Sequence, residues 1–341
     1  MSIPGIPFFT GAGVPVVLVG LTYAAGARRR AGCGHPVGPL RHAAFATGLM
    51  LLFLSLQWPF AEWAHKLFYV HQIGIMVARI MAPILIVLAH PAGLLIAGLP
   101  RRTRKHFLKP AISAALVRKA WHLAVQPAVS LGLYVGMLLF WEIPETQSAA
   151  VAYPGIGLLM HLSLLLVGLL FWTGIFERRP APHGISHGKR LMMIWLAILM
   201  QIGLGVYFTV KTSVLYHAYA ATQRMAMIAP LTDERRGGFF IWVPSALLSL
   251  LALIVVIDLW ARHETKMDAK RTRWSPSNSA ILLYPTTARE MRAMTRVKNR
   301  RLAIGMAAFA LLIFTAICGF ATGAHRLSRR ENLRLYALSH R

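Results

Sequence analysis

Long apolar stretches alternate with short polar gaps along almost the whole chain. A helix needs about 20 apolar residues to span a bilayer, where its backbone groups must be satisfied internally. The stretches of this kind are residues 10–27, 43–63, 68–89, 120–141, 155–176, 191–211, 239–260 and 302–322. The pattern predicts an all-α, polytopic transmembrane helical bundle of about seven to eight spans, forming a single domain over residues 1–341.

Basic residues are concentrated in every second gap between these stretches. Four gaps, residues 28–42, 90–119, 177–190 and 261–301, hold 26 of the 37 Lys and Arg residues. Cytoplasmic loops retain Lys and Arg, so these gaps are expected to face the cytoplasm. The chain is therefore predicted to cross a bacterial inner membrane several times, with its N-terminus in the periplasm.

The longest inner gap, 261–301, has a pattern of its own. Met291, Met294 and Val297 recur at helical spacing among arginines, which is typical of a basic helix on the inner membrane surface. A solvated basic loop explains the same residues equally well. The tail after residue 322 is also basic, although eight spans would place it outside, so the side of the tail stays open.

Composition narrows the range of functions. The chain is 56% hydrophobic and 14% charged, with a formal net charge of +26. Because the charge lies beside apolar spans, we expect anionic lipid headgroups at the inner face, and not nucleic acid, as its partners. Cys33 and Cys318 form no CxxC pair, no HExxH, GxSxG or phosphate-binding glycine loop is present, and we expect no enzyme activity. Gly237-Gly238 is predicted to form a turn before a helix.

Several ionisable side chains lie at one depth, near the outer ends of the predicted spans. Such groups are costly in a membrane and are the first candidates for function. The primary candidates are His71, His161, Glu142 and Asp233, and the secondary ones are His217, His65 and Met160. Imidazole and carboxylate suit a divalent transition metal, and a nearby thioether favours Cu(I). Two histidines could instead hold a haem iron, or each could simply form a hydrogen bond between helices.

Arg79 is a separate case, because it lies about two turns deeper than His71 on the same predicted helix. No acid in the predicted spans lies at a matching depth. We expect its guanidinium to bind backbone carbonyls or a neighbouring helix, with contact to a partner subunit as the alternative.

Two of the helical stretches resemble the CtaG-type caa3 cytochrome c oxidase assembly factors. The segment FYVHQIGIMVARIMAPILIVLAHP resembles the family helix that carries an outer His, a central Ala-Pro and an inner Pro. The segment MHLSLLLVGLLFW resembles the family's His-containing fifth helix. The matching residues are His71, Ala82, Pro83, Pro91, His161, Gly168 and Trp172.

The outer loop and the start of the next helix, residues 216–244, are similar to the family as well, over a resemblance that covers roughly residues 15–260. The matching residues here are Tyr216, Tyr219, Asp233, Gly238 and Trp242. Other family positions are changed: the residues present are Ile75, Glu142, Met160 and Glu234, where the family usually has His, His, an acid and Gln, respectively.

The resemblance implies a role in building a haem–copper cytochrome c oxidase, with oxidase subunits as partners and copper presented at the periplasmic face. His71 and His161 would be the ligands, and Glu142 and Asp233 would supply oxygen ligands. Three alternatives stay open. The first is a metal-free scaffold or accessory subunit of a respiratory complex, which the changed positions favour. The second is a bis-His haem-binding redox subunit, and the third is a transporter.

Overall fold

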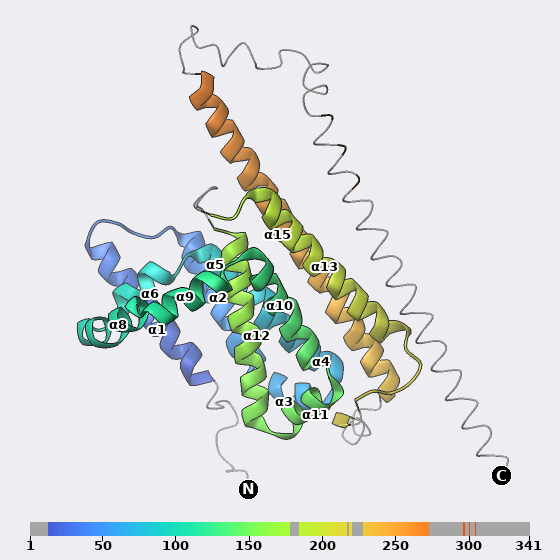
Figure 1. Cartoon of the computed structure of the whole chain (residues 1–341). Helices are drawn as coiled ribbons and strands as arrows, with labels where there is room; N and C mark the ends of the chain where they lie inside the picture. Colours follow the sequence, from blue (N-terminus) through green and yellow to red (C-terminus); the bar gives the residue numbers. More distant parts are fainter. Residues whose placement is uncertain are drawn as a thin grey trace, which may run out of the picture. The chain divides into compact units, whose positions relative to one another are not determined.

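The computed structural model describes residues 13–177, 184–216, 218–219 and 228–272, together with Arg296, Arg300 and Ile304. The chain divides into two compact units, Met1–Val256 and Ile257–Arg341. All the regular secondary structure within the described residues is helical, which confirms the all-α class (Figure 1). The single transmembrane domain stays a prediction.

The first half of the chain contains two long helices followed by a series of shorter ones. They are α1 (Gly13–Gly32), α2 (Pro39–Ser55), α3 (Phe60–Lys66), α4 (Phe68–Met76), the π-helical turn η1 (Val77–Met81), α5 (Ala82–Ala89), α6 (Ala92–Gly98), α7 (Arg101–Thr103), the π-helical turn η2 (Arg104–Leu108), α8 (Lys109–Ser113) and α9 (Ala115–Ala124). The second half contains α10 (Pro127–Trp141), α11 (Pro144–Ala152), α12 (Pro154–Ile175), α13 (His187–Val210) and α15 (Pro230–Thr272).

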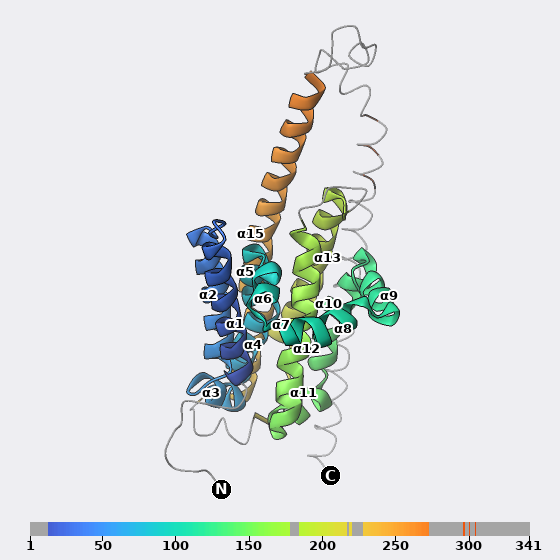
Figure 2. The same cartoon turned by 90° about the vertical axis from the view of Figure 1, so that its left-hand side faces the viewer.

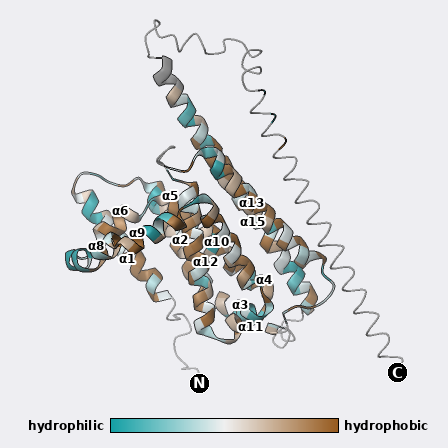
Figure 3. Cartoon of the chain, in the orientation of Figure 1, coloured by the Kyte–Doolittle hydropathy of each residue, from teal (hydrophilic) through white to brown (hydrophobic). Residues whose placement is uncertain are grey.

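Four segments are individually long and apolar enough to cross a membrane: 68–89, 154–175, 187–210 and 230–265. Two bent pairs, α2 with α3 and α9 with α10, raise the number of candidate spans to six within the described residues. The apolar composition of these helices is visible in Figure 3. The chain is therefore a helical membrane protein, whereas the predicted count of seven to eight spans is not confirmed. The stretch 302–322 and most of 261–301 lie outside the described residues.

The predicted continuous span 120–141 is broken near its start. Helices α9 and α10 meet at an angle of 79° around Val125 and Gln126, just before Pro127. Proline disfavours helical geometry in the preceding residue, so α10 begins afresh there. In α9, Arg118 and Lys119 share the helix with exposed Trp121, which is the composition of a helix that lies along a membrane surface.

The predicted turn at Gly237-Gly238 is wrong, because both residues lie inside α15. A Cβ atom at Gly237 would lie 2.2 Å from the Phe68 ring, and one at Gly238 would lie 2.6 Å from Phe208 Cβ. The two glycines therefore allow α15 to pack closely against α4 and α13. Close packing, not chain reversal, explains them.

Unit 1 has its core where α4, η1 and α5 pack against α10, α12 and α13, and Figure 2 shows α4 and α5 between α2 and α12. Ile80, Phe171 and Ile194 are fully buried in this core, and Tyr134 stacks on Phe171 with ring centres 4.1 Å apart. The core holds the N-terminal ends of α4 and α12 side by side. This arrangement positions the candidate site.

Pro83 explains the π-helical turn that precedes it. Proline has no amide hydrogen to donate to the carbonyl four residues earlier, which belongs to Arg79. Trp172 Nε1 on α12 donates to that carbonyl instead, at 3.2 Å. Gly168 permits the approach, since a Cβ atom there would lie 2.5 Å from the same oxygen. Pro83, Gly168 and Trp172 together locate α12 against η1.

Candidate functional site

His71 on α4 and His161 on α12 lie next to each other near the N-terminal ends of their helices. Their ring centres are 6.0 Å apart and the ring planes meet at 47°. His71 is only 4% exposed, whereas His161 is half-buried. The structure therefore brings together the two histidines that sequence placed at one depth.

Each of these two imidazoles has one nitrogen suited to bind a ligand. His161 Nδ1 is 2.8 Å from the Gly157 carbonyl oxygen. A carbonyl only accepts hydrogen bonds, so Nδ1 carries the hydrogen and Nε2 keeps its lone pair. That Nε2 lies over α4, 3.6 Å from where a Cβ atom at Gly74 would be. His71 Nε2 is buried and has no hydrogen-bond partner within the described part of the chain.

The secondary candidates are arranged less favourably. His65 is exposed at the end of α3, close enough for electrostatic interaction with both imidazoles. Met160 is fully buried in an apolar cluster with Leu138 and Leu164. His217 lies outside the described residues. In the chain as far as the structure describes it, no group of three or more His, Cys, Asp or Glu residues could hold a metal ion.

Asp233 binds the first turn of the helix that carries His71. Its carboxylate accepts hydrogen bonds from the backbone amides of Phe68, at 2.8 Å, and Tyr69, at 3.1 Å. The first amides of a helix have no partner within the helix, so an acceptor at this position stabilises the helix end. The geometry gives Asp233 a capping role across 165 residues of sequence.

Glu234, the next residue along α15, holds the loop that follows α13. Its carboxylate pairs with Lys211 and accepts hydrogen bonds from the amides of Leu215, at 3.0 Å, and Tyr216, at 2.7 Å. Both charged side chains are almost completely buried. Neighbouring acids on α15 thus fix α4 on one side and the loop 211–216 on the other.

The same loop holds Glu142 at the end of α10. The Tyr216 hydroxyl is 2.7 Å from the Glu142 carbonyl oxygen and 3.1 Å from its Oε2 atom. Glu142 Oε1 is buried without a hydrogen-bond partner among the described residues. Burial raises the pKa of Glu142 from its ordinary value of 4.5 to about 7. Glu142 is therefore partly protonated near neutral pH.

An aromatic cluster lies between this network and the histidines. The Phe68 ring stacks on Tyr216 with ring centres 4.5 Å apart, and the Tyr219 ring lies edge-on to His71 at 6.1 Å. Gln147 on α11 donates to the Tyr219 hydroxyl at 3.1 Å. The cluster packs tightly against His71 and leaves His161 as the more accessible member of the pair.

Arg79 is inside the bundle and only 2% exposed. Its guanidinium lies 4.4 Å above the Tyr134 ring and donates to the Tyr134 carbonyl at 3.4 Å. A cavity of about 10 Å³ between Gln72, Arg79 and Ser245 is at the lower limit for one water molecule. Arg79 thus joins η1 to α10 inside the chain, and a partner could not touch it in this conformation.

Lys211 and Gln147 belong to the network around Tyr216 and Tyr219, although the sequence pattern did not predict this role. Lys211 did carry a signal, since it is one of the few basic residues in the outer gaps. Gln147 carried none, because a polar residue after a span is ordinary. Tyr216 and Tyr219 were identified only through the family resemblance, without a role.

Comparison with known proteins decides the family. The family model described as cytochrome c oxidase caa3 assembly factor (Caa3_CtaG) matches residues 21–263. The chain belongs to this family. The matched region includes the histidine pair, Asp233, Glu234 and the Arg79–Trp172 hydrogen bond, so the resemblance seen in the sequence is confirmed for the region that builds the site.

Curated relatives of this Caa3_CtaG-family chain come from mycobacteria. It is similar to an uncharacterized protein of Mycobacterium leprae, 23% identical over 300 residues, which are 83% of this chain and 44% of the relative. Uncharacterized proteins of Mycobacterium bovis and Mycobacterium tuberculosis are each 23% identical over 292 residues, with the same coverage. The chain thus spans less than half the length of these relatives. No solved structure matches it.

Proposed function

We propose that this chain assists assembly of a haem–copper cytochrome c oxidase by holding a copper ion between His71 and His161 at the periplasmic face. The family supports the assembly role. The single observation that supports the copper site is the pair of imidazoles 6.0 Å apart, each with an Nε2 atom free to bind.

Imidazole nitrogens are suitable ligands for copper, but the chain supplies only two of them. Imidazole nitrogen is a good copper ligand, and a ligating His commonly donates its other ring hydrogen to a backbone carbonyl, as His161 does to Gly157. Two protein ligands leave positions open for a receiving protein. An assembly factor needs such openness, because a fully enclosed ion could not be passed on.

Glu142 and Asp233 have supporting roles in this proposal. Asp233 caps α4 and so fixes the helix that carries His71. Glu142 is bound to Tyr216 of the outer loop. These acids hold the site in place without contributing oxygen ligands to the ion.

Complementation of a strain that lacks the chain tests the proposal, with oxidase assembly as the measured outcome. In a strain that lacks the chain, we expect the wild type to restore copper content and activity of the membrane oxidase, and His71→Ala/His161→Ala to fail. His35→Ala/His122→Ala is a matched control, since both residues are exposed and far in sequence from the pair. Full restoration by the His71/His161 variant would contradict the copper role.

A metal-free scaffold is the second candidate function, and the engagement of Glu142 and Asp233 in structural hydrogen bonds favours it. In that case oxidase subunits would co-purify with the chain equally well after both histidines are replaced, and oxidase activity would be normal. An absorption spectrum of the purified chain tests the haem alternative, because bis-His haem gives a Soret band and copper does not.

Copper binding should weaken in acid. A ligating imidazole must be neutral, so protons compete with the ion for both Nε2 atoms. We expect the apparent affinity for Cu(I) to fall once the pH is lowered below the pKa of the two imidazoles in the copper-free chain. A competition titration with a chromophoric Cu(I) chelator at several pH values measures it. An affinity that stays independent of pH down to the acid unfolding of the chain would contradict ligation by the two histidines.

A further inference from the structure

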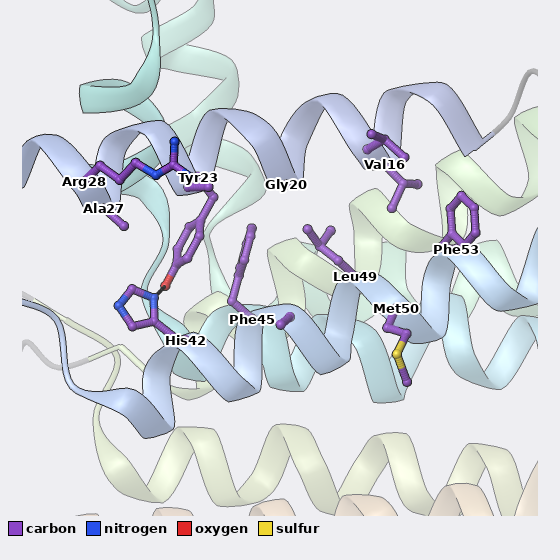
Figure 4. Close-up of a pocket in the computed structure, with 13 residues that line it drawn as sticks. Val16, Gly20, Tyr23, Ala27, Arg28, His42, Phe45, Leu49, Met50 and Phe53 are labelled. Atoms are coloured by element: carbon purple, nitrogen blue, oxygen red, sulfur yellow. Dashed lines mark hydrogen bonds between the residues drawn. The ribbon is translucent and has the colours of Figure 1, made fainter.

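A long apolar groove runs between α1 and α2, on a part of unit 1 separate from the histidine pair (Figure 4). Its volume is about 590 Å³, within the range of about 300–1,000 Å³ usual for ligand pockets. Val16, Leu49, Met50 and Phe53 line its length, and Arg28, Tyr23 and His42 lie at one end. The groove is thus apolar along its length and polar at its tip.

Packing on other helices keeps the groove open. Helix α1 is drawn against α6, since a Cβ atom at Gly26 would lie 1.9 Å from the Leu94 carbonyl oxygen. Helix α2 packs instead against α5, where a Cβ atom at Gly48 would lie 3.0 Å from Ile86 Cγ1. Each helix is thus held by a different neighbour, and α1 and α2 meet where Tyr23 stacks on Phe45 with ring centres 3.8 Å apart, so the groove lies beside this contact. The groove is a consequence of the fold.

The charge at the polar end has no acidic counterpart among the residues that the structure describes. Arg28 is exposed and has no hydrogen-bond or ion-pair partner among the described residues, and the first 61 residues of the chain contain no Asp or Glu. Arg29 and Arg41, by contrast, donate to backbone carbonyls. Arg29 binds carbonyls at the end of α6, and Arg41 binds carbonyls at the end of α5. His42 Nδ1 is 3.2 Å from the Tyr23 hydroxyl, which orients its ring at the groove end.

We propose that this groove binds an anionic phospholipid, with an acyl chain along α1 and α2 and the phosphate beside Arg28 and His42. In a bilayer an apolar groove has little preference among acyl chains, because lipid tails are as apolar as its lining. Selectivity therefore comes from the charged end, where each Lys or Arg contributes about 1 kcal/mol to attraction of anionic lipid. The proposal is independent of the copper site.

Native mass spectrometry of the full purified chain tests the headgroup contact. Phosphatidylglycerol and phosphatidylcholine with identical acyl chains are added in equal amounts. We expect the wild type to favour phosphatidylglycerol, and Arg28→Gln to reduce that preference about fivefold. Arg118→Gln, an exposed arginine on α9, is the matched control and should keep the full preference. An unchanged preference in Arg28→Gln would overturn the proposal.

A second pair of variants tests the groove itself. Ala46 lines it, whereas Ala43 is exposed on the same helix and does not. Ala46→Trp should fill the space and lower the number of tightly bound lipids, and Ala43→Trp should not. Equal lipid binding in both variants would overturn the groove assignment. Displacement of the lipid by soluble glycerol phosphate alone would show a surface anion site instead, and would overturn it as well.

Discussion

Gly237 shows at the scale of one residue how tightly the N-terminal end of α4 is enclosed. A Cβ atom there would lie 2.2 Å from the Phe68 ring. We expect Gly237→Ala to destabilise the protein by about 1–3 kcal/mol, the usual effect of overpacking. The control is Gly132→Ala in α10, which has open space and should be neutral or slightly stabilising because Ala favours helix. Thermal unfolding in detergent measures both, and equal stability would contradict the packing argument.

Substitutions of Asp233 distinguish a role as helix cap from a role as metal ligand. Asp233→Ala removes the acceptor for the Phe68 and Tyr69 amides, so we expect a loss of about 0.5–2 kcal/mol. Asp233→Asn keeps one acceptor oxygen and should lose less stability. If Asp233 only caps α4, the Asn variant should still bind as much copper as the wild type. Loss of copper in a folded Asn variant would instead make Asp233 a ligand.

Glu142 makes stability depend on pH. Its pKa in the folded chain is about 7, above its ordinary value of 4.5, so the folded chain binds this proton more strongly than the unfolded chain. The contribution to stability is full below pH 4.5 and is lost as pH rises through about 7, by up to about 1.4 kcal/mol per pH unit. Glu142→Gln should remove this dependence and be more stable than the wild type at pH 8. If the unfolding temperatures of the wild type and Glu142→Gln changed with pH in parallel, the result would contradict this role of Glu142.

At the scale of elements, the contact between η1 and α12 can be tested by a double-mutant cycle. Trp172→Phe removes the donor to the Arg79 carbonyl and should cost about 1–3 kcal/mol. Pro83→Ala restores a backbone amide that can bond to the same carbonyl. We therefore expect Trp172→Phe to cost less in the Pro83→Ala background. Additive losses would show that the two residues act independently.

The bounds of the helices show which parts of the fold could be predicted from the sequence. The apolar stretch 68–89 was predicted within the bounds that the structure gives, because its composition alone defines it. The break before Pro127 and the continuation of α15 through Gly237 were missed. In both cases the outcome depends on what packs against the segment, and hydrophobic pattern carries no information about neighbours.

At the candidate site too, the position of a residue along its helix could be predicted from the sequence, whereas its packing contacts could not. Depth along separate helices was enough to place His71 and His161 at one level, and packing then brought them together. The role of Asp233 as a cap for α4 could not be predicted, since its partners lie 165 residues away. A carboxylate in a predicted loop looks the same whether it binds a metal or backbone amides.

At the scale of the whole molecule, the distribution of basic residues predicts the orientation in the membrane. Cys33 is exposed in the gap 28–42, which is predicted to be cytoplasmic. In a Cys318→Ser background, a membrane-impermeant maleimide should not label Cys33 in intact spheroplasts, and should label it after lysis. An added Cys at Glu145, predicted to be periplasmic, should be labelled in both. Labelling of Cys33 in intact spheroplasts would contradict the predicted orientation.

The copper content of the purified full chain, after loading with Cu(I) and removal of loosely bound ion, tests the central claim most directly. We predict about one copper per chain for the wild type and for His35→Ala/His122→Ala, and strong loss for His71→Ala/His161→Ala. Equal copper in all three proteins, or none in any of them, would contradict a copper site between α4 and α12.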